Sequence, residues 1–219
     1  MDAEITRLKD KLLIMASMAE SATSQALKAL LRRDDELARQ TRREEETIDR
    51  LELEIDELTL DLLTRKPDLP TVRFLAVAMK IVHDLERVGD EATTIARRCL
   101  ELGREPGLRE SEGVLPMGRE ALDMLKDALD AFVRQDPALA RAVIPRDKEV
   151  DAMNRCFQDE LVELMRRDQT VIRSALSLTV VAKCLERVAD HATNIAEMVV
   201  YLYEGCDIRH QESMSQSSS

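Results

Sequence analysis

A twelve-residue segment near the middle of the chain returns near its end, and this repeat constrains the fold more than any other feature. Residues 85–96 read LERVGDEATTIA and residues 185–196 read LERVADHATNIA, with nine identical positions in one ungapped register. Agreement of this length at a fixed offset indicates an internal duplication. The offset, 185 − 85 = 100 residues, is nearly half of the 219-residue chain.

The duplication extends towards the N-terminus of each copy. Residues 33–39 resemble residues 135–141, and residues 45–49 resemble residues 147–151, both at an offset of 135 − 33 = 102. We place the two-residue change in register at the Pro-rich connection 66–70, because a loop is where a duplicated helical unit tolerates a change of length.

The composition is typical of helices and excludes several functions. Aromatic residues make up only 2% of the chain and charged residues 34%, whereas strands are usually enriched in aromatic and β-branched residues. A net charge of −11 argues against nucleic-acid binding, which needs a clustered basic surface. No signal region and no apolar run of the ~20 residues that a membrane span needs is present. We therefore expect a cytoplasmic chain, peripheral to a membrane at most.

Apolar residues at helical spacing predict three long helices in each half of the chain. The expected helices cover residues 5–33, about 35–65, 70–103, about 116–134, 137–167 and 170–204. Long helices that are joined by short turns most simply form an antiparallel bundle. The predicted fold is therefore all-α, with two tandem antiparallel three-helix bundles.

Glycine and proline mark the expected boundaries. The segment 103–113 holds three of the six glycines, so we place the first bundle at 1–105 and the second at 113–210. The polar residues 211–219 are expected to form a disordered tail. Pro145 falls inside the fifth expected helix, where it removes one hydrogen bond and should kink the helix. Four scattered cysteines without Cys-x-x-Cys spacing predict reduced core thiols.

Acidic side chains follow the expected helices at intervals of about one turn. Glu86 and Asp90 are spaced i, i+4 on the third helix, and Glu45 and Asp49 have the same spacing on the second. Their counterparts in the second half are Asp147, Asp151, Glu186 and Asp190. The two lines continue through Glu52, Asp56 and Thr93 in the first half, and through Asn154, Gln158, Thr193 and Glu197 in the second. If the lines of each half face one another, four carboxylates meet in each of two grooves.

Four converging carboxylates need cations between them. Oxygen ligands favour hard ions such as Mg²⁺, Mn²⁺, Ca²⁺ or Fe³⁺, and so much negative charge favours more than one ion with bridging carboxylates. The alternative is that acidic lines are solvated faces that pair with nearby Lys and Arg. The repetition of both lines in both halves favours grooves over solvated faces. His83 and His191 are interpreted as surface or rim residues, and the ten methionines as core filler.

The motif Glu-Arg-Val-Gly/Ala-Asp at 86–90 and 186–190, with the acid-x-x-x-Asp pairs at 45–49 and 147–151, resembles the PhoU family of phosphate-signalling regulators. The ending 201–210 is similar to that of enterobacterial members. The resemblance implies two three-helix bundles related by a pseudo-twofold axis, each with a place for a multinuclear iron or zinc cluster. It also implies a cytoplasmic negative regulator of the phosphate regulon, which acts between the high-affinity phosphate ABC transporter, through its ATPase subunit, and the phosphate sensor histidine kinase.

The family's acidic pairs can be carried over position by position. The implied metal ligands are Glu86, Asp90, Asp147, Asp151, Glu186 and Asp190, with Glu45 and Asp49 completing the first site. Glu45 stands where the family usually has Asp, and its acidic neighbours Glu44 and Glu46 leave the register open. Pro145, close ahead of Asp147, departs from the family pattern and would tilt one ligand-bearing helix.

Three functions can be compared on these residues. The first is a non-enzymatic signalling adaptor with metal in its acidic grooves and no catalytic residues. The second is a carboxylate-bridged di-iron enzyme, which uses Glu-x-x-His pairs. None is present, because Lys80, Val188 and Asp207 precede the three histidines by three residues. The third is a metal-free helical scaffold that contacts basic segments of membrane proteins. Exposed apolar positions on the long helices favour a homodimer.

Overall fold

The computed structural model describes residues 1–105 and 113–208, and within these ranges it contains helices and no strand. The α-helices are α1 (Asp2–Arg32), α2 (Asp35–Thr64), α3 (Leu69–Leu102), α4 (Leu115–Arg134), α5 (Pro137–Val143), α6 (Asp147–Arg167) and α7 (Ile172–Glu204). Two 3₁₀ turns, Ile144–Arg146 and Gln169–Val171, lead into α6 and α7. The predicted all-α fold is confirmed. The expected tail and most of the expected linker lie outside the described residues.

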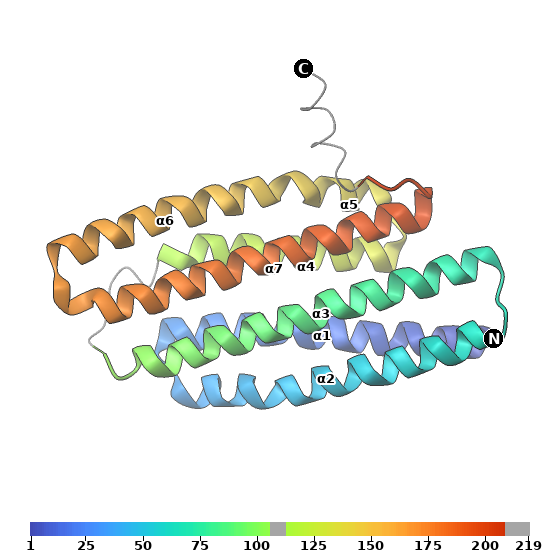
Figure 1. Ribbon diagram of the computed structural model, residues 1–219, viewed down its shortest axis with the longest axis horizontal. Helices are drawn as coiled ribbons and strands as arrows, with labels where there is room; N and C mark the ends of the chain where they lie inside the picture. Colours follow the sequence, from blue (N-terminus) through green and yellow to red (C-terminus); the bar gives the residue numbers. More distant parts are fainter. Residues whose placement is uncertain (106–112, 209–219) are drawn as a thin grey trace, which may run out of the picture.

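Two bundles lie against each other along one long seam (Figure 1). Helices α1, α2 and α3 pack on one another in the first half. In the second half α4, α5 together with α6, and α7 take the corresponding places. Helices α3 and α7 run side by side in opposite directions, and α1 also touches α4. Helices α3 and α7 therefore pack both within their own bundle and against the other one. The limits 1–105 and 113–210 stay predictions.

The turn between the first two helices of each bundle is built in the same way. Asp34 and Asp136 each accept hydrogen bonds from the two backbone N–H groups two and three residues further on, at 3.0–3.1 Å. These bonds satisfy N–H groups that a helix start leaves without a partner. Arg33 and Gln135, the preceding residues, both have left-handed backbone conformations, with φ of 54° and 57°. The duplication therefore includes this turn.

Pro145 has the predicted effect on the second bundle. α5 ends at Val143, a 3₁₀ turn contains the proline, and α6 begins at Asp147. Proline cannot donate a backbone hydrogen bond and its ring clashes with the preceding turn, so the helix is interrupted here. The corresponding stretch of the first bundle is the continuous α2.

The repeated motif packs its apolar side chains into the core. Leu85, Val88, Leu185 and Val188 are fully buried. Gly89 lies so close to α2 that a Cβ atom at this position would stand 3.0 Å from Ile48 Cδ1. Helices α2 and α3 therefore approach each other closely at this glycine. Beside this buried stripe, the acids at 86 and 90 lie along the contact of α3 with α2, and the acids at 186 and 190 lie along the contact of α7 with α6.

None of the helices in the described ranges has the length and apolar character that crossing a membrane requires.

Candidate metal-binding grooves and the seam between the bundles

Five neighbouring carboxylates, which we call the first acidic groove, lie along the contact of α2 with α3: Glu45, Asp49, Glu52, Glu86 and Asp90. Burial raises the pKa of Glu45, which a hydrogen bond from Thr93 lowers in part and the charge of Asp90 raises further. Burial also raises the pKa of Asp49 and of Glu86, and in both cases Asp90 is the strongest charged neighbour. A carboxylate that loses water and faces like charges binds its proton more tightly. The structure thus brings the predicted acids of the two helices together.

The second acidic groove lies between α6 and α7 and contains Asp147, Asp151, Glu186, Asp190 and Glu197. Burial raises the pKa of Asp147 to about 6, and the four other carboxylates of the groove add to the rise. Burial and then Glu186 raise the pKa of Asp190, while Lys183 acts against this rise. The four acids predicted for this half are therefore neighbours, as in the first groove. Their role as metal ligands stays a prediction.

Each groove contains a buried carboxylate oxygen that accepts no hydrogen bond from any residue of the described ranges. These atoms are Glu86 Oε2 and Asp147 Oδ1. Arg87 compensates the first groove in part, with its Nε 3.6 Å from Glu86 Oε2 and its Nη1 3.2 Å from Asp90 Oδ2. A buried acceptor without a donor is costly, and more so when it is charged. The donor set of both grooves, oxygen atoms of several clustered carboxylates, fits iron, zinc, magnesium or manganese.

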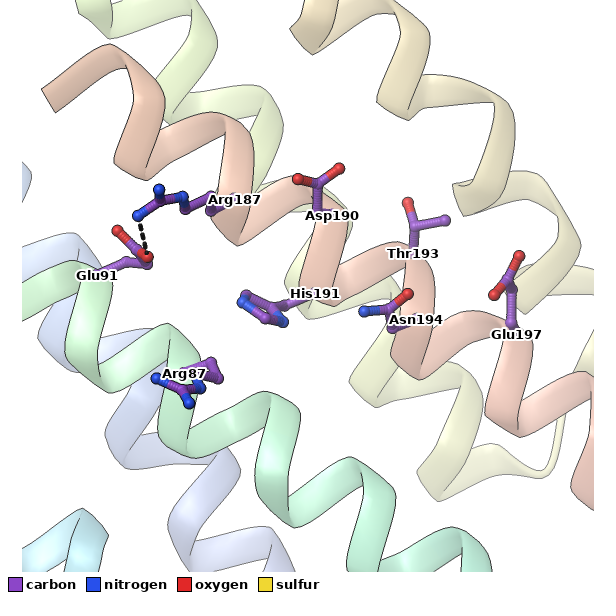
Figure 2. A pocket seen from close by; sticks show the side chains of 8 residues that line it. All are labelled: Arg87, Glu91, Arg187, Asp190, His191, Thr193, Asn194 and Glu197. Carbon is purple, nitrogen blue, oxygen red and sulfur yellow. Dashed lines mark hydrogen bonds and ion pairs between the residues drawn. The ribbon is translucent and has the colours of Figure 1, made fainter. Parts of the chain in front are cut away.

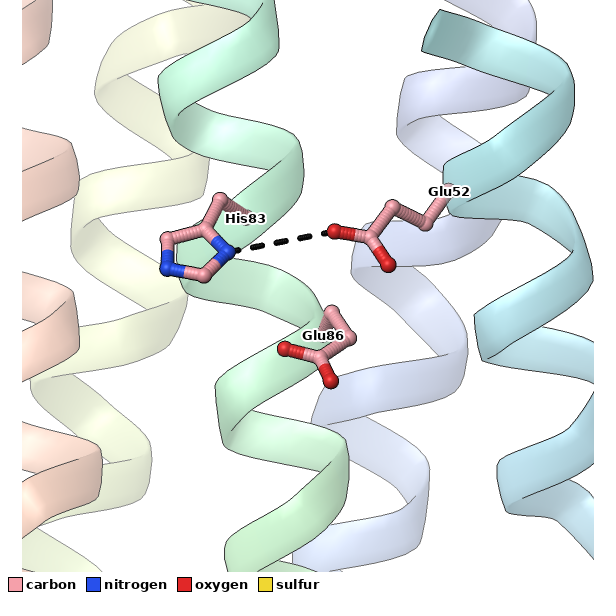
Figure 3. A group of neighbouring side chains, drawn as sticks. All are labelled: Glu52, His83 and Glu86. Atoms are coloured by element: carbon pink, nitrogen blue, oxygen red, sulfur yellow. Dashed lines mark ion pairs between the residues drawn. The ribbon is translucent and has the colours of Figure 1, made fainter.

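His83, predicted to be a surface or rim residue, is exposed and lies at the edge of the first groove. His83 is 60% exposed, yet its Nδ1 lies 3.8 Å from Glu52 Oε1 (Figure 3). Ligand atoms of Glu52, His83 and Glu86 all lie within 4.8 Å of one another. The order here is the reverse of a Glu-x-x-His pair, because His83-x-x-Glu86 also places the two side chains one turn apart.

The seam between α3 and α7 contains a polar network that sequence reasoning missed. Asp84 is buried on α3, where its Oδ1 lies 2.9 Å from His191 Nδ1 and accepts a hydrogen bond of 3.1 Å from Asn194 Nδ2. Buried Glu91 accepts a 3.1 Å hydrogen bond from Arg187 (Figure 2). The expectation for His191 needs correction, because its side chain is only 18% exposed and is paired across the seam.

The internal offset could have pointed to this network. At 100 residues, Asp84 corresponds to Cys184 and Glu91 corresponds to His191. The structure brings these positions together crosswise: Asp84 contacts His191, and burial, together with the neighbouring Glu91, raises the pKa of the Cys184 thiol. The two contacts are therefore the two copies of one pseudo-symmetric pair. The sequence signal for this network was that two duplicated positions of the motif helices carry different polar residues in the two halves, Asp or Cys at one and Glu or His at the other.

The fold and the grooves define a class of protein: tandem three-helix bundles, joined through their third helices, with carboxylates gathered between the second and third helix of each. The PhoU domain family matches this chain twice, over residues 12–99 and 114–199. The chain belongs to the PhoU family.

Known members are similar over nearly the whole chain. The phosphate-specific transport system accessory protein PhoU homolog of Pseudomonas putida is 39% identical over 213 residues, which cover 95% of this chain and 82% of that protein. The homolog of Aquifex aeolicus (strain VF5) is 35% identical, with 95% of both chains covered. The PhoU protein of Escherichia coli (strain K12) is 30% identical over 95% of this chain and 87% of its own.

Solved structures confirm the fold. The crystal structure of PhoU from Pseudomonas aeruginosa superposes with a TM-score of 0.90 at 37% identity, over 94% of this chain and 99% of that chain. The phosphate transport system regulatory protein PhoU from Streptococcus pneumoniae gives a TM-score of 0.87 at 31% identity, over 94% and 98%. These relatives are named as accessory and regulatory proteins, which confirms the prediction that the chain is not an enzyme.

Proposed function

We propose that this protein is a negative regulator of the phosphate regulon, a cytoplasmic adaptor that couples the high-affinity phosphate ABC transporter to its sensor histidine kinase. The observation that carries the proposal is the full-length similarity, across both bundles, to proteins named for the phosphate-specific transport system. The partners are the ATPase subunit of the transporter and the kinase. Through them the adaptor modulates phosphate uptake and represses the regulon.

The architecture suits an adaptor. Most side chains of the repeated motif lie in the core, in the grooves or in the seam between the bundles, so the solvent-exposed faces of the long helices can present docking surfaces. A net charge of −11 favours contacts with basic protein surfaces over contacts with nucleic acid. The homodimer remains part of this proposal, and sedimentation of the purified protein tests it.

Metal in the acidic grooves is a second part of the proposal. The bound ions would be a multinuclear iron or zinc cluster, or magnesium or manganese, held in the first groove by Glu45, Asp49, Glu86 and Asp90 and in the second by Asp147, Asp151, Glu186 and Asp190. A cation neutralises mutually repelling carboxylates and links the two helices that carry them. The buried oxygens of Glu86 and Asp147 are the structural support for this part.

A reporter strain tests the regulatory function. The gene is deleted in the bacterium that carries it, and a reporter under a phosphate-regulated promoter is followed in phosphate-rich medium. The reporter should switch on in the deletion strain and be repressed again by the wild-type gene. The purified protein should also retain the transporter ATPase and the cytoplasmic part of the kinase on an affinity column. A reporter that stays repressed in the deletion strain would contradict the proposal.

Elemental analysis tests the metal. Wild-type protein purified without chelator is compared with the variant Glu86→Gln/Asp90→Asn/Glu186→Gln/Asp190→Asn, with circular dichroism as the control for folding. Several metal equivalents in the wild type and none in the folded variant are expected. A wild-type protein without metal would contradict the metal sites. The alternative of a metal-free helical scaffold would then stand, with the acidic surfaces as docking surfaces.

A further inference from the structure

The two grooves differ at one end, and the difference concerns three pairs of duplicated positions. In the first groove, Glu52 of α2 faces His83 and Glu86 of α3 (Figure 3). At the offsets of 102 and 100 residues, their counterparts in the second groove are Asn154, Lys183 and Glu186. Only the last position keeps its residue type. The two positions around it change from a carboxylate and an imidazole to an amide and an ammonium group.

In the second groove, the chain itself neutralises the shared glutamate. Lys183 Nζ lies 2.5 Å from Glu186 Oε2, and buried Asn154 donates a 2.7 Å hydrogen bond to the same oxygen through Nδ2. Glu186 is thus paired with a positive charge and with an amide donor. An ion-paired and hydrogen-bonded carboxylate has little left to offer a metal ion at this oxygen.

In the first groove, the same glutamate is surrounded by groups that can bind metal. Glu86 Oε2 is buried and accepts no hydrogen bond from the described residues, and Arg87, 3.6 Å away, is shared with Asp90. Glu52 offers a carboxylate, whose pKa is raised by burial and by the charge of Asp56. His83 offers a ring nitrogen. A cation bound between Glu52, His83 and Glu86 would neutralise Glu86, as the ammonium group of Lys183 neutralises Glu186 in the other bundle.

We propose that Glu52, His83 and Glu86 form a mixed nitrogen and oxygen site for a zinc-class divalent cation, present in the first bundle and not in the second. The proposal deepens the proposed metal loading of the grooves, and it rests on that part only through Glu86. It differs from the all-carboxylate sets by its imidazole ligand, which favours Zn²⁺ and related ions over Mg²⁺ and Ca²⁺.

Metal binding requires the three ligand atoms to move closer together. Zinc is held by histidine nitrogen and carboxylate oxygen at about 2.0–2.2 Å, with three protein ligands and a water when a position stays open. Neighbouring ligand atoms in such a site are therefore about 3–3.5 Å apart. The ligand atoms of Glu52, His83 and Glu86 lie within 4.8 Å of one another, and 3.8 Å separates His83 Nδ1 from Glu52 Oε1, so rotations of these side chains must draw the atoms together around the ion. Because His83 is well exposed, the site lies at the mouth of the groove and exchanges its ion with the solvent.

Competition for Zn²⁺ against a chromophoric chelator, on metal-free full-length protein, tests the site. His83→Gln should weaken the tightest Zn²⁺ binding at least about tenfold, since one of three ligands is lost. It should leave Mg²⁺ binding unchanged. Loaded with Co²⁺ in place of zinc, the wild type should show visible absorption bands that the variant lacks. His191→Gln is the matched control, because this histidine is paired with Asp84 and should not change either result. Unchanged Zn²⁺ affinity and Co²⁺ spectrum in His83→Gln would overturn the proposal.

Transfer of the site into the second bundle provides the opposite test. The double variant Lys183→His/Asn154→Glu should gain one Zn²⁺ equivalent, and Lys183→Gln, which removes the same charge without supplying a ligand, should gain none. Equal stoichiometry in the double variant and the wild type would count against the three residues as a ligand set.

The variant Asp49→Asn/Asp90→Asn separates this proposal from the proposed carboxylate clusters. It leaves Glu52, His83 and Glu86 in place, so it should keep its Zn²⁺ affinity even if other metal is lost. Loss of His83-dependent Zn²⁺ binding in this variant, with the fold intact by circular dichroism, would contradict a separate site.

Discussion

The two acidic grooves come from one duplicated helix pair, and they differ in how the negative charge of their shared glutamate, Glu86 or Glu186, is neutralised. The second groove contains its own cation, Lys183, and an amide donor, Asn154, both directed at Glu186. The first groove has His83 and Glu52 at these positions and an unpartnered oxygen on Glu86. At its other end, however, the second groove has the stronger charge repulsion, because four neighbouring carboxylates act on the partly buried Asp147 and raise its pKa.

This comparison shows which part of a duplicated site is fixed by the fold and which part is free to change. The acids at 86 and 90, or at 186 and 190, lie beside the buried stripe of their helix and keep their place as long as the bundle keeps its packing. The residues one turn earlier can exchange a ligand for a cation without disturbing the core. The predictions below use matched pairs of positions to test how far the two halves behave alike.

The largest effect is expected from the core of the motif. Leu85 and Leu185 are both fully buried. Leu85→Ala and Leu185→Ala should each lower the free energy of unfolding by about 2–5 kcal/mol, from lost burial and the cavity that remains. Because α3 and α7 pack along their length, we expect each variant to shift a single urea transition of the whole chain, followed by circular dichroism. Two transitions, of which only one moves in each variant, would show that the bundles unfold separately.

A smaller effect is expected from charge repulsion in the second groove. Asp147 has a pKa of about 6 in the folded state against an ordinary value of 3.8. Between these values the folded protein binds more protons than the unfolded chain, so stability in metal-free buffer should fall as pH rises from about 4 to 6. The full shift corresponds to about 3 kcal/mol, which we reduce to about 1–2 kcal/mol because Asp147 is only partly buried and solvent screens part of the repulsion.

Asp147→Asn should therefore stabilise the metal-free protein by about 1–2 kcal/mol at pH 7 and flatten its pH profile. Asp147 begins α6, and the helix dipole opposes this gain by only about 0.5 kcal/mol. Glu45→Gln, the matched change in the first groove, should gain less, because a hydrogen bond from Thr93 already stabilises the Glu45 carboxylate. Urea denaturation at pH 5, 6 and 7 with chelator measures both. If Asp147→Asn is less stable than the wild type at pH 7, the prediction is wrong, and the repulsion between Asp147 and its neighbouring carboxylates does not destabilise the folded protein.

Much of the fold was predictable because its signals are local. The helix limits follow from apolar periodicity, the break in the second bundle from Pro145, and the acidic lines from i, i+4 spacing. That Glu45 and Asp90 come together required one further assumption, namely that the acidic faces of adjacent helices point at each other. The repetition of both lines supplied the reason for that assumption, since a solvated face has no need to recur at the same register.

The rest depends on contacts between residues that are far apart in the chain. The contact between Asp84 and His191 spans 107 residues, and no periodicity along one helix shows that α3 meets α7. His83 faces Glu52 because of the register between α2 and α3, which apolar spacing does not determine. Polar pairs across a seam follow from how the bundles dock, and docking is a property of the whole surface.

The helix caps give a pair of matched changes with a moderate effect. Asp34→Ala and Asp136→Ala each remove a side chain that accepts two backbone hydrogen bonds at a helix start. Each should cost about 1 kcal/mol of stability in urea denaturation. Amide hydrogen exchange should distinguish the halves, because the seven-residue α5 depends on its cap more than the 30-residue α2 does. Equal loss of protection in both helices would show that α5 is held by packing alone.

The smallest effect is expected one residue earlier in the same turns. Gln135 has a left-handed φ of 57°, a conformation that costs a residue with a side chain about 1 kcal/mol and costs glycine nothing. Since glycine also makes the unfolded chain more flexible, Gln135→Gly should gain only about 0.5 kcal/mol. Arg33, at φ 54°, differs because its guanidinium donates hydrogen bonds to the backbone carbonyls of Leu102 and Glu105 at the end of α3.

Arg33→Gly relieves the same strain and loses these contacts, so we expect no gain or a slight loss in melting temperature. A matched rise in both variants would mean that the exposed arginine contributes nothing to stability and that the two turns are energetically equivalent. A rise in Gln135→Gly alone would show that the first bundle uses this turn to hold the end of α3, the helix that carries Glu86 and His83, whereas the second bundle uses it only to reverse the chain.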